Sequence, residues 1–294
     1  MNQNEKAKRF TELHMKGAPL LLYNACDVGS AKSILEAGAP AIATSSWSVA
    51  EAQGYRDGEA IPIELAEQII GRIAPTIDIP VTVDFEGGYS EDDGELAYNI
   101  ARLLGLSVIG INFEDRVVKG TGLYDIDRQA RRIAAIRSVA ENKAVGFFIN
   151  ARTDLFLGQG RDAAHSVGEA LDRDNAYAAA GASGFFIPGL RDAALIGRIC
   201  DGATLLVNVM VMDGRDKAPQ RNDQFACQRD DHGLARATTA ISGAGAIPHC
   251  ERALLLKHQK PPGELDHAAA DPGVAGSGEP LFAALRAALI RRAG

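Results

Sequence analysis

Short apolar segments alternate with amphipathic stretches from residue 20 to residue 211, and this alternation restricts the possible folds more than any other feature. The apolar segments are rich in Ile, Val and Phe and are apolar on both faces, as strands of a parallel sheet are when helices cover both sides. We expect seven such strands, at residues 20–23, 41–44, 81–83, 108–113, 145–149, 184–187 and 205–211.

Between these strands, apolar residues recur at helical intervals with Arg, Glu and Asp on the opposite side. Helices are therefore predicted at residues 28–37, 63–73, 92–104, 127–141, 167–180 and 192–199. Repeated strand–helix units predict an α/β fold, a (β/α)8 barrel of the TIM type, whose usual size is about 250 residues. The alternative is a doubly wound open sheet, which normally carries a glycine-rich phosphate loop after its first strand. Residues 24–29 contain no GxGxxG motif, so the barrel is preferred.

The last part of the barrel is less regular. Residues 213–232 are polar and predict a loop, and residues 235–241 are the candidate for the final strand. The remaining chain combines a stretch rich in Pro, Gly, Asp and Ala with a terminal amphipathic helix. We therefore divide the chain into a catalytic barrel domain, 1–257, and a linker with a C-terminal helix, 258–294. That helix packs either on its own barrel or on a neighbouring subunit.

Charge and composition exclude several classes of protein. The formal net charge is −7 and the sequence pI is about 5.4, which argues against a nucleic-acid partner. No stretch approaches the roughly 18 apolar residues that span a membrane, and the N-terminus lacks the apolar centre of a secretory signal. The four cysteines show neither a CxxC motif nor a zinc-site spacing. These features predict a soluble, cytoplasmic enzyme.

Acidic residues follow two of the predicted strands, at the ends where a barrel of this type builds its active site. Asp84 and Glu86 follow the third strand, and Glu114 ends the fourth. Like charges so close destabilise one another unless a cation shares them, and oxygen ligands without His or Cys favour Mg²⁺ (or Mn²⁺) over zinc. Asp84 and Glu86 are two residues apart on a segment predicted to be extended, so their side chains emerge on the same side. Capping of helices or pairing with surface cations is the simpler alternative for any one of these acids.

Other strand ends carry candidates for substrate binding. Arg152 follows the fifth strand, where a planar guanidinium could clamp a substrate carboxylate or pair with Asp154 at the rim. Asn208 lies on the seventh strand. The second strand is followed by a predicted polar turn that either is a simple loop or holds a carbonyl or enolate oxygen with its N–H groups. This turn consists of Ser45, Ser46 and Trp47.

Taken together and in order, the strand-end segments resemble the isocitrate lyase/phosphoenolpyruvate mutase superfamily over roughly residues 8–212. The segments are TSS, GYRDG, VDFEGGY, INFEDRVVKG, INARTD, FFIPGL and VNVMV, which are specific as a set and not singly. The resemblance implies a (β/α)8 barrel that exchanges its eighth helix between subunits in a homodimer or homotetramer. It also implies Mg²⁺-dependent making or breaking of C–C or P–C bonds beside an α-keto or enolate carboxylate.

The resemblance further implies roles for individual residues. Asp84 would bind the metal directly, and Asp57, Glu86 and Glu114 would hold its waters. Residues 116–124 would form a mobile gate over the site. The residues implied for catalysis are Arg152, Lys119, Glu114 and Asp57, and those implied for substrate binding are Ser45, Ser46, Trp47, Arg152 and Asn208.

The sequence departs from the family pattern in three places. Isocitrate and methylisocitrate lyases carry a KKCGH gate whose Cys acts as the acid, whereas residues 117–125 read VVKGTGLYD. Phosphoenolpyruvate mutase and phosphonopyruvate hydrolase have a longer gate, in which only Lys119 matches well. Glu86 stands where most members have Asp, and residues 213–260 do not follow the family pattern.

These observations predict a Mg²⁺-dependent lyase that cleaves a C–C bond beside an α-keto acid or 2-hydroxy di-acid, as methylisocitrate lyase does. One alternative is P–C chemistry on a phosphonopyruvate-like substrate, by a mutase or hydrolase, or decarboxylation of oxaloacetate. A second alternative is an α-keto acid-binding protein without catalytic activity, which the missing gate cysteine leaves open. In each case the partner is a small-molecule carboxylate.

Overall fold

The computed structural model describes residues 1–14, 20–157, 162–212, 222–229 and 235–242. All of them belong to one compact unit, Met1–His258. The linker and C-terminal helix predicted for residues 258–294, and the exchange of that helix between subunits, lie outside the described residues. The domain boundary at residue 257 therefore stays a prediction.

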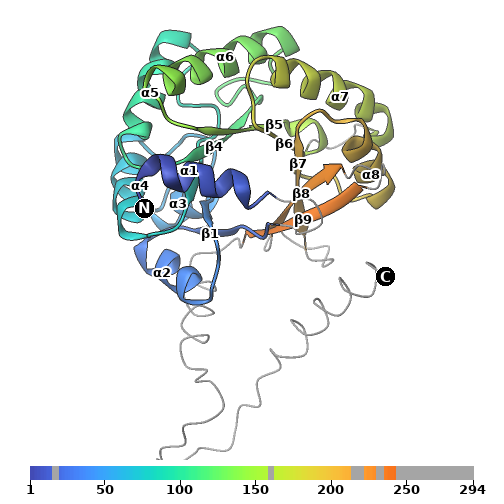
Figure 1. The fold of residues 1–294 in the computed structure, drawn as a ribbon. Helices are drawn as coiled ribbons and strands as arrows, with labels where there is room; N and C mark the ends of the chain where they lie inside the picture. Colours follow the sequence, from blue (N-terminus) through green and yellow to red (C-terminus); the bar gives the residue numbers. More distant parts are fainter. Residues whose placement is uncertain (15–19, 158–161, 213–221, 230–234, 243–294) are drawn as a thin grey trace, which may run out of the picture. The chain divides into compact units, whose positions relative to one another are not determined.

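Seven parallel strands follow one another in chain order and curl into a barrel-like sheet (Figure 1). They are β1 (Tyr23–Ala25), β2 (Ile42–Thr44), β3 (Val81–Asp84), β4 (Gly110–Glu114), β5 (Phe148–Arg152), β6 (Gly184–Phe186) and β7 (Leu206–Met212). The register pairs Asp84 with Asn112 and Asn112 with Asn150, so polar residues of three adjacent strands lie at one level. The predicted fold class, a parallel α/β barrel, is confirmed.

The sheet continues beyond β7 with two further strands. β8 (Asn222–Arg229) pairs antiparallel with β7, and β9 (Ala235–Ser242) pairs antiparallel with β8 and parallel with β7 through Met210 and Ala240. The loop predicted at residues 213–232 is therefore wrong over β8, whereas the last strand predicted at residues 235–241 is confirmed. The β8 segment NDQFACQR contains no β-branched residue, so its composition does not indicate a strand.

Helices cover the outside of the sheet (Figure 1). They are α1 (Gln3–Glu12), α2 (Val28–Glu36), α3 (Ser46–Ala52), α4 (Ile63–Thr76), α5 (Asp93–Leu104), α6 (Ile126–Asn142), α7 (Ala163–Ala179) and α8 (Ala193–Gly202). Several begin at an Asp whose carboxylate accepts a backbone N–H of the first turn, as at Asp27, Asp92 and Asp125. Of the helices that the structure describes, none is long and apolar enough to cross a bilayer.

Helix α1 covers the end of the barrel at which the strands begin. Its Phe10 is buried in a cluster with Leu20, Leu22 and Phe148. The first strand was predicted at residues 20–23 but begins at Tyr23, because Leu20 and Leu22 are apolar for their packing in this cluster and not for a place in the sheet. The carboxyl ends of the strands consequently lie at the opposite end of the barrel.

Candidate active site

Four acidic side chains, which we call the acid cluster, gather at the carboxyl ends of the strands. Asp84 ends β3, Glu86 follows it, Glu114 ends β4, and Asp57 lies in the connection between α3 and α4. Burial raises the pKa of Glu86, and charge repulsion from Asp57, Asp84 and Glu114 raises it further, to about 9. The four carboxyl groups therefore lie within electrostatic range of one another.

Ser46 connects two of these acids. Its hydroxyl lies 2.9 Å from Asp84 Oδ2 and 3.2 Å from Asp57 Oδ1, and its backbone N–H donates to Asp84 Oδ2 at 3.3 Å. Because a serine hydroxyl has a single proton, it donates to one carboxylate at a time. Ser46 thereby fixes one oxygen of Asp84 and leaves the other, Oδ1, free of this contact.

The polar turn predicted after β2 is wrong, because a helix starts there. Ser45 is the N-cap of α3, and its side chain accepts the N–H of Ser48. Ser46 and the half-buried Trp47 occupy the first turn of this helix. Serine is common both at helix N-caps and in turns, so the sequence of this segment indicates a loop although a helix starts there.

Glu86 reaches the acid cluster by a different path from the one predicted. β3 ends at Asp84, and Glu86 has φ of 48°, a left-handed conformation that is unfavourable for residues other than glycine. The segment is thus not extended beyond Asp84. Glu86 is nevertheless 3% exposed, and its Oε2 accepts the N–H of Glu59 at 2.8 Å.

Arg152 lies among three carboxylates at the end of β5. Its Nε and Nη2 donate to the two oxygens of Asp154 at 2.7 and 3.2 Å, and its Nη1 lies 3.0 Å from Glu114 Oε2 and 3.8 Å from Asp84 Oδ1. Burial lowers the pKa of Arg152, but Asp154, Glu114 and Asp84 more than offset this and raise it well above its ordinary value. The rim pair with Asp154 is present, and Nη1 is the atom that faces the acid cluster.

The cluster holds more negative groups than one guanidinium can balance. Burial raises the pKa of Glu114 to about 8, although Arg152 acts in the opposite direction and Asp154 and Asp84 add to the increase. Burial also raises the pKa of Asp84. Glu86 and Glu114 are therefore protonated at neutral pH in this structure, which is one way to relieve the repulsion. A bound cation is the other.

The carboxylates fit a hard cation. Asp84 Oδ1 and Glu86 Oε1 are buried and accept no hydrogen bond from the described residues, although buried acceptors are costly when they lack a donor. All candidate ligands are oxygens, as Mg²⁺ prefers. Across the described ranges, no three His, Cys, Asp or Glu side chains are grouped to bind one ion together. The buried oxygens Asp84 Oδ1 and Glu86 Oε1 are thus the atoms of this region that a hard cation would satisfy.

Asparagine side chains line the barrel at the level of Asp84. Asn150 Nδ2 donates to Asn112 Oδ1 at 2.8 Å. A Cβ at Gly184 would lie 2.8 Å from Asn150 Oδ1, so glycine on β6 makes room for this amide. Asn208 on β7 is also buried, and its Oδ1 has no hydrogen-bond partner in the described part of the chain. Amide groups of this kind could orient polar atoms of a ligand.

Residues 116–124, which we call the gate segment, form a short hairpin beside the acids. Arg116 pairs with Leu123, and the N–H of Tyr124 donates to the carbonyl oxygen of Asp115 at 2.8 Å. Arg173 of α7 donates both to the Asp115 carboxylate and to the carbonyl oxygen of Tyr124, each at 3.0 Å. The two ends of the hairpin are thus tied to α7, while Lys119 is exposed between them.

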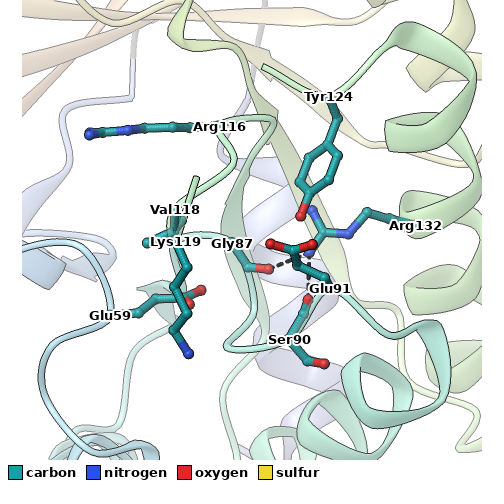
Figure 2. Close-up of a pocket in the computed structure, with 9 residues that line it drawn as sticks. All are labelled: Glu59, Gly87, Ser90, Glu91, Arg116, Val118, Lys119, Tyr124 and Arg132. Atoms are coloured by element: carbon teal, nitrogen blue, oxygen red, sulfur yellow. Dashed lines mark hydrogen bonds between the residues drawn. The ribbon is translucent and has the colours of Figure 1, made fainter. Parts of the chain in front are cut away.

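Two residues that organise this region, Glu59 and Arg132, were not predicted. Arg132 is 1% exposed, donates to the carbonyl oxygens of Gly87 and Ser90, and lies against the ring of Tyr124 (Figure 2). Its sequence signal is an arginine on the buried face of α6, three residues after the buried Gln129. Glu59 has no such signal, because its role depends on a loop conformation.

A parallel barrel with buried carboxylates and a guanidinium at the carboxyl ends of its strands has the architecture of the (β/α)-barrel enzymes. Within that class, the chain belongs to the phosphoenolpyruvate phosphomutase family, whose model matches residues 10–229.

Three similar proteins illustrate this membership. A “putative phosphonomutase” of Burkholderia cenocepacia has a crystal structure with a TM-score of 0.73 and 38% identity, over 87% of this chain and 97% of that one. An uncharacterized protein of Mycobacterium tuberculosis is 32% identical over 86% of this chain and 91% of its own length. A “Probable 2-methylisocitrate lyase 2” of Corynebacterium glutamicum is 32% identical over 56% of this chain and 53% of its own length.

Proposed function

We propose that the protein is a Mg²⁺-dependent lyase that cleaves a C–C bond beside the carboxylate of a 2-hydroxy or 2-oxo acid. The observation that carries this proposal is the buried Asp84 next to Arg152, with Oδ2 held by Ser46 and Oδ1 accepting no hydrogen bond from the described residues. The similarity to the C. glutamicum lyase supports C–C chemistry. A bound Mg²⁺ would supply positive charge opposite the negative charge that develops on the substrate.

The chain's own residues supply orientation and proton transfer. Arg152 is held by Asp154, so that Nη1 remains directed at the acid cluster, where a substrate carboxylate would accept its hydrogen bond. When the C–C bond of a 2-hydroxy acid breaks, the hydroxyl loses its proton as the keto group forms, and the leaving fragment takes up the electron pair and a proton. We assign the proton acceptor to Glu114, whose own proton a bound cation would displace, the donor to Lys119, and the orienting amide to Asn208.

The substrate class can be tested directly. Purified protein with Mg²⁺ is offered 2-methylisocitrate, oxaloacetate and phosphonopyruvate in separate reactions, and release of pyruvate is followed by a coupled NADH assay. We expect pyruvate from 2-methylisocitrate, the 2-hydroxy acid of the three, and we expect chelation of the metal to stop the reaction.

Two other outcomes would assign the alternatives. Phosphate released from phosphonopyruvate, without cleavage of the other two compounds, would contradict a C–C lyase and establish P–C chemistry. The family and the similarity to the Burkholderia protein are the reasons to test this alternative. Mg²⁺-dependent binding of oxalate in calorimetry, without product from any compound, would identify a binding protein.

Binding of Mg²⁺ is expected to tighten as the pH rises. Glu86 and Glu114 have pKa values of about 9 and 8, so both carry protons at pH 7 that a cation displaces. Affinity should increase from pH 6.5 to 9, by up to about tenfold per pH unit for each proton released. Calorimetry in two buffers of different ionisation enthalpy measures the released protons, and Glu86→Gln should release one fewer. An affinity that does not change with pH would contradict this coupling.

A further inference from the structure

Glu59 makes an unusual pair of contacts with the loop that follows β3. Its own N–H donates to Glu86 Oε2 at 2.8 Å, and its Oε1 accepts the N–H of Tyr89 at 2.7 Å. Glu59 therefore bridges the two ends of residues 86–89 with one backbone group and one side-chain group. The Glu86 carboxylate cannot turn away from its present position without losing the hydrogen bond from Glu59.

The backbone is strained at both ends of this bridge. This strain indicates that the contacts fix the loop of residues 86–89 and the connection between α3 and α4. Glu59, Glu86 and Tyr89 have φ of 54°, 48° and 62°, all in the left-handed region. Residues other than glycine keep this conformation only where surrounding contacts impose it. The bridge supplies such contacts for all three residues at once, and it joins the loop that carries Asp57 to the loop that carries Glu86.

The same carboxylate lies next to the gate segment. Glu59 and Lys119 line one small cavity (Figure 2), and the Lys119 ammonium lies close enough to interact electrostatically with Glu59. A Cβ at Gly87 would come within 2.9 Å of Val118 and 3.1 Å of Glu59 Oε1. Glycine at this position therefore allows the gate segment and Glu59 to approach the backbone between them.

From this geometry we propose that Glu59 is a positioning residue, which orients the carboxylate of Glu86 and holds the ammonium of Lys119 near the loop that follows β3. The inference rests on the proposed function for the roles of Glu86 and Lys119 in the reaction. Glu59 itself need not touch the substrate. It acts through one residue of the acid cluster and one of the gate, so its loss should affect ligand binding and gate position together.

The first test measures Mg²⁺-dependent binding of oxalate by calorimetry for the full-length protein and its variants. Glu59→Gln keeps the shape of the side chain but removes its charge, and Glu59→Ala removes the acceptor for Tyr89. Glu59→Gln should weaken binding by about tenfold, because the N–H of Tyr89 then donates to a neutral acceptor and the charge opposite Lys119 is gone, and Glu59→Ala, which loses the hydrogen bond from Tyr89 altogether, should weaken it more. Glu64→Gln, an exposed acid in the first turn of α4, should bind oxalate as the wild type does. Thermal melting verifies that each variant is folded.

The second test follows Lys119 itself and does not depend on activity. Trypsin cleaves after lysine where the backbone opens locally, so the rate of cleavage between Lys119 and Gly120 reports how often the gate segment opens. We expect faster cleavage in folded Glu59→Gln than in the wild type or Glu64→Gln. In a double-mutant cycle, the effects of Glu59→Gln and Lys119→Ala on oxalate binding should be less than additive, which a purely structural role of Glu59 would not produce.

The outcomes separate the two proposals. If the wild type binds oxalate with Mg²⁺ but both Glu59 variants bind it equally well, and cleavage at Lys119 is unchanged, the positioning role is overturned while the proposed function stands. If the wild type binds neither Mg²⁺ nor oxalate, the proposed function fails, and the cleavage rates then decide whether Glu59 holds Lys119.

Discussion

Replacement of Asp84 by alanine should reduce Mg²⁺-dependent kcat/KM by about a thousandfold or more, because a metal contributes several kcal/mol of charge stabilisation and each factor of ten corresponds to about 1.4 kcal/mol. Asp84 offers a buried oxygen that accepts no hydrogen bond from the described residues, and its other oxygen is held by the hydroxyl and N–H of Ser46. An oxygen so placed is oriented for a ligand before the ligand arrives. Steady-state kinetics over a range of Mg²⁺ concentrations measures the loss.

A second variant separates lost chemistry from lost structure. Asp84→Asn keeps the size of the side chain and an oxygen for Ser46, but it removes the charge that Mg²⁺ requires. Burial and repulsion from Asp57 raise the pKa of Asp84 despite Arg152, so the charge is unfavourable in the metal-free protein. The Asn variant should therefore melt at a temperature no lower than the wild type while binding Mg²⁺ far more weakly. Full Mg²⁺-dependent turnover by either variant would refute the metal assignment.

Replacement of Arg152 by lysine should lower kcat/KM by about a hundredfold, chiefly through KM. Lysine keeps the positive charge but lacks the planar fork with which Arg152 binds both oxygens of Asp154 while Nη1 faces Glu114. Truncating one partner of a buried, hydrogen-bonded charge pair costs about 2–5 kcal/mol, and the smaller change to lysine should cost a part of that. The kinetics are compared with calorimetric titration of oxalate, whose dissociation constant should rise in parallel.

Arg128→Lys is a matched control, because Arg128 also makes two hydrogen bonds to one carboxylate, that of Asp93, away from the acid cluster. It should leave kcat/KM within about twofold of the wild type, as expected for a partly exposed pair. If Arg152→Lys has wild-type kinetics, the guanidinium serves only to hold Asp154 and Glu114. Arg152→Met is less informative, because it leaves three buried acids without their cation and is expected to cost about 3–5 kcal/mol of stability.

Hydrophobic alternation was sufficient to predict the parallel barrel and the helices around it, because each of the first seven strands is apolar on both faces. It located the acids and Arg152 correctly at strand ends, since strand ends can be read from where an apolar run stops. It placed the first strand three residues too early, because the apolar character of Leu20 and Leu22 reflects packing with α1.

The contacts that arrange the site could not be predicted from hydrophobic alternation. Glu59 and Glu86, both in left-handed conformations, are joined by one hydrogen bond between residues 27 positions apart. β8 is held by backbone pairing with β7 and not by an apolar pattern. Of the residues that make these contacts, Arg132 has a recognisable sequence signal, because it is a charged residue on the buried face of α6.

Helix α1 also bears on how a ligand would reach the site. Phe10 of α1 is packed at the end of the barrel where the strands begin. On the proposed function, a small acid would therefore enter, and its products would leave, at the carboxyl ends of the strands beside residues 116–124. Product release would then precede each new binding event, and the rate at which those residues move aside would set an upper limit on turnover.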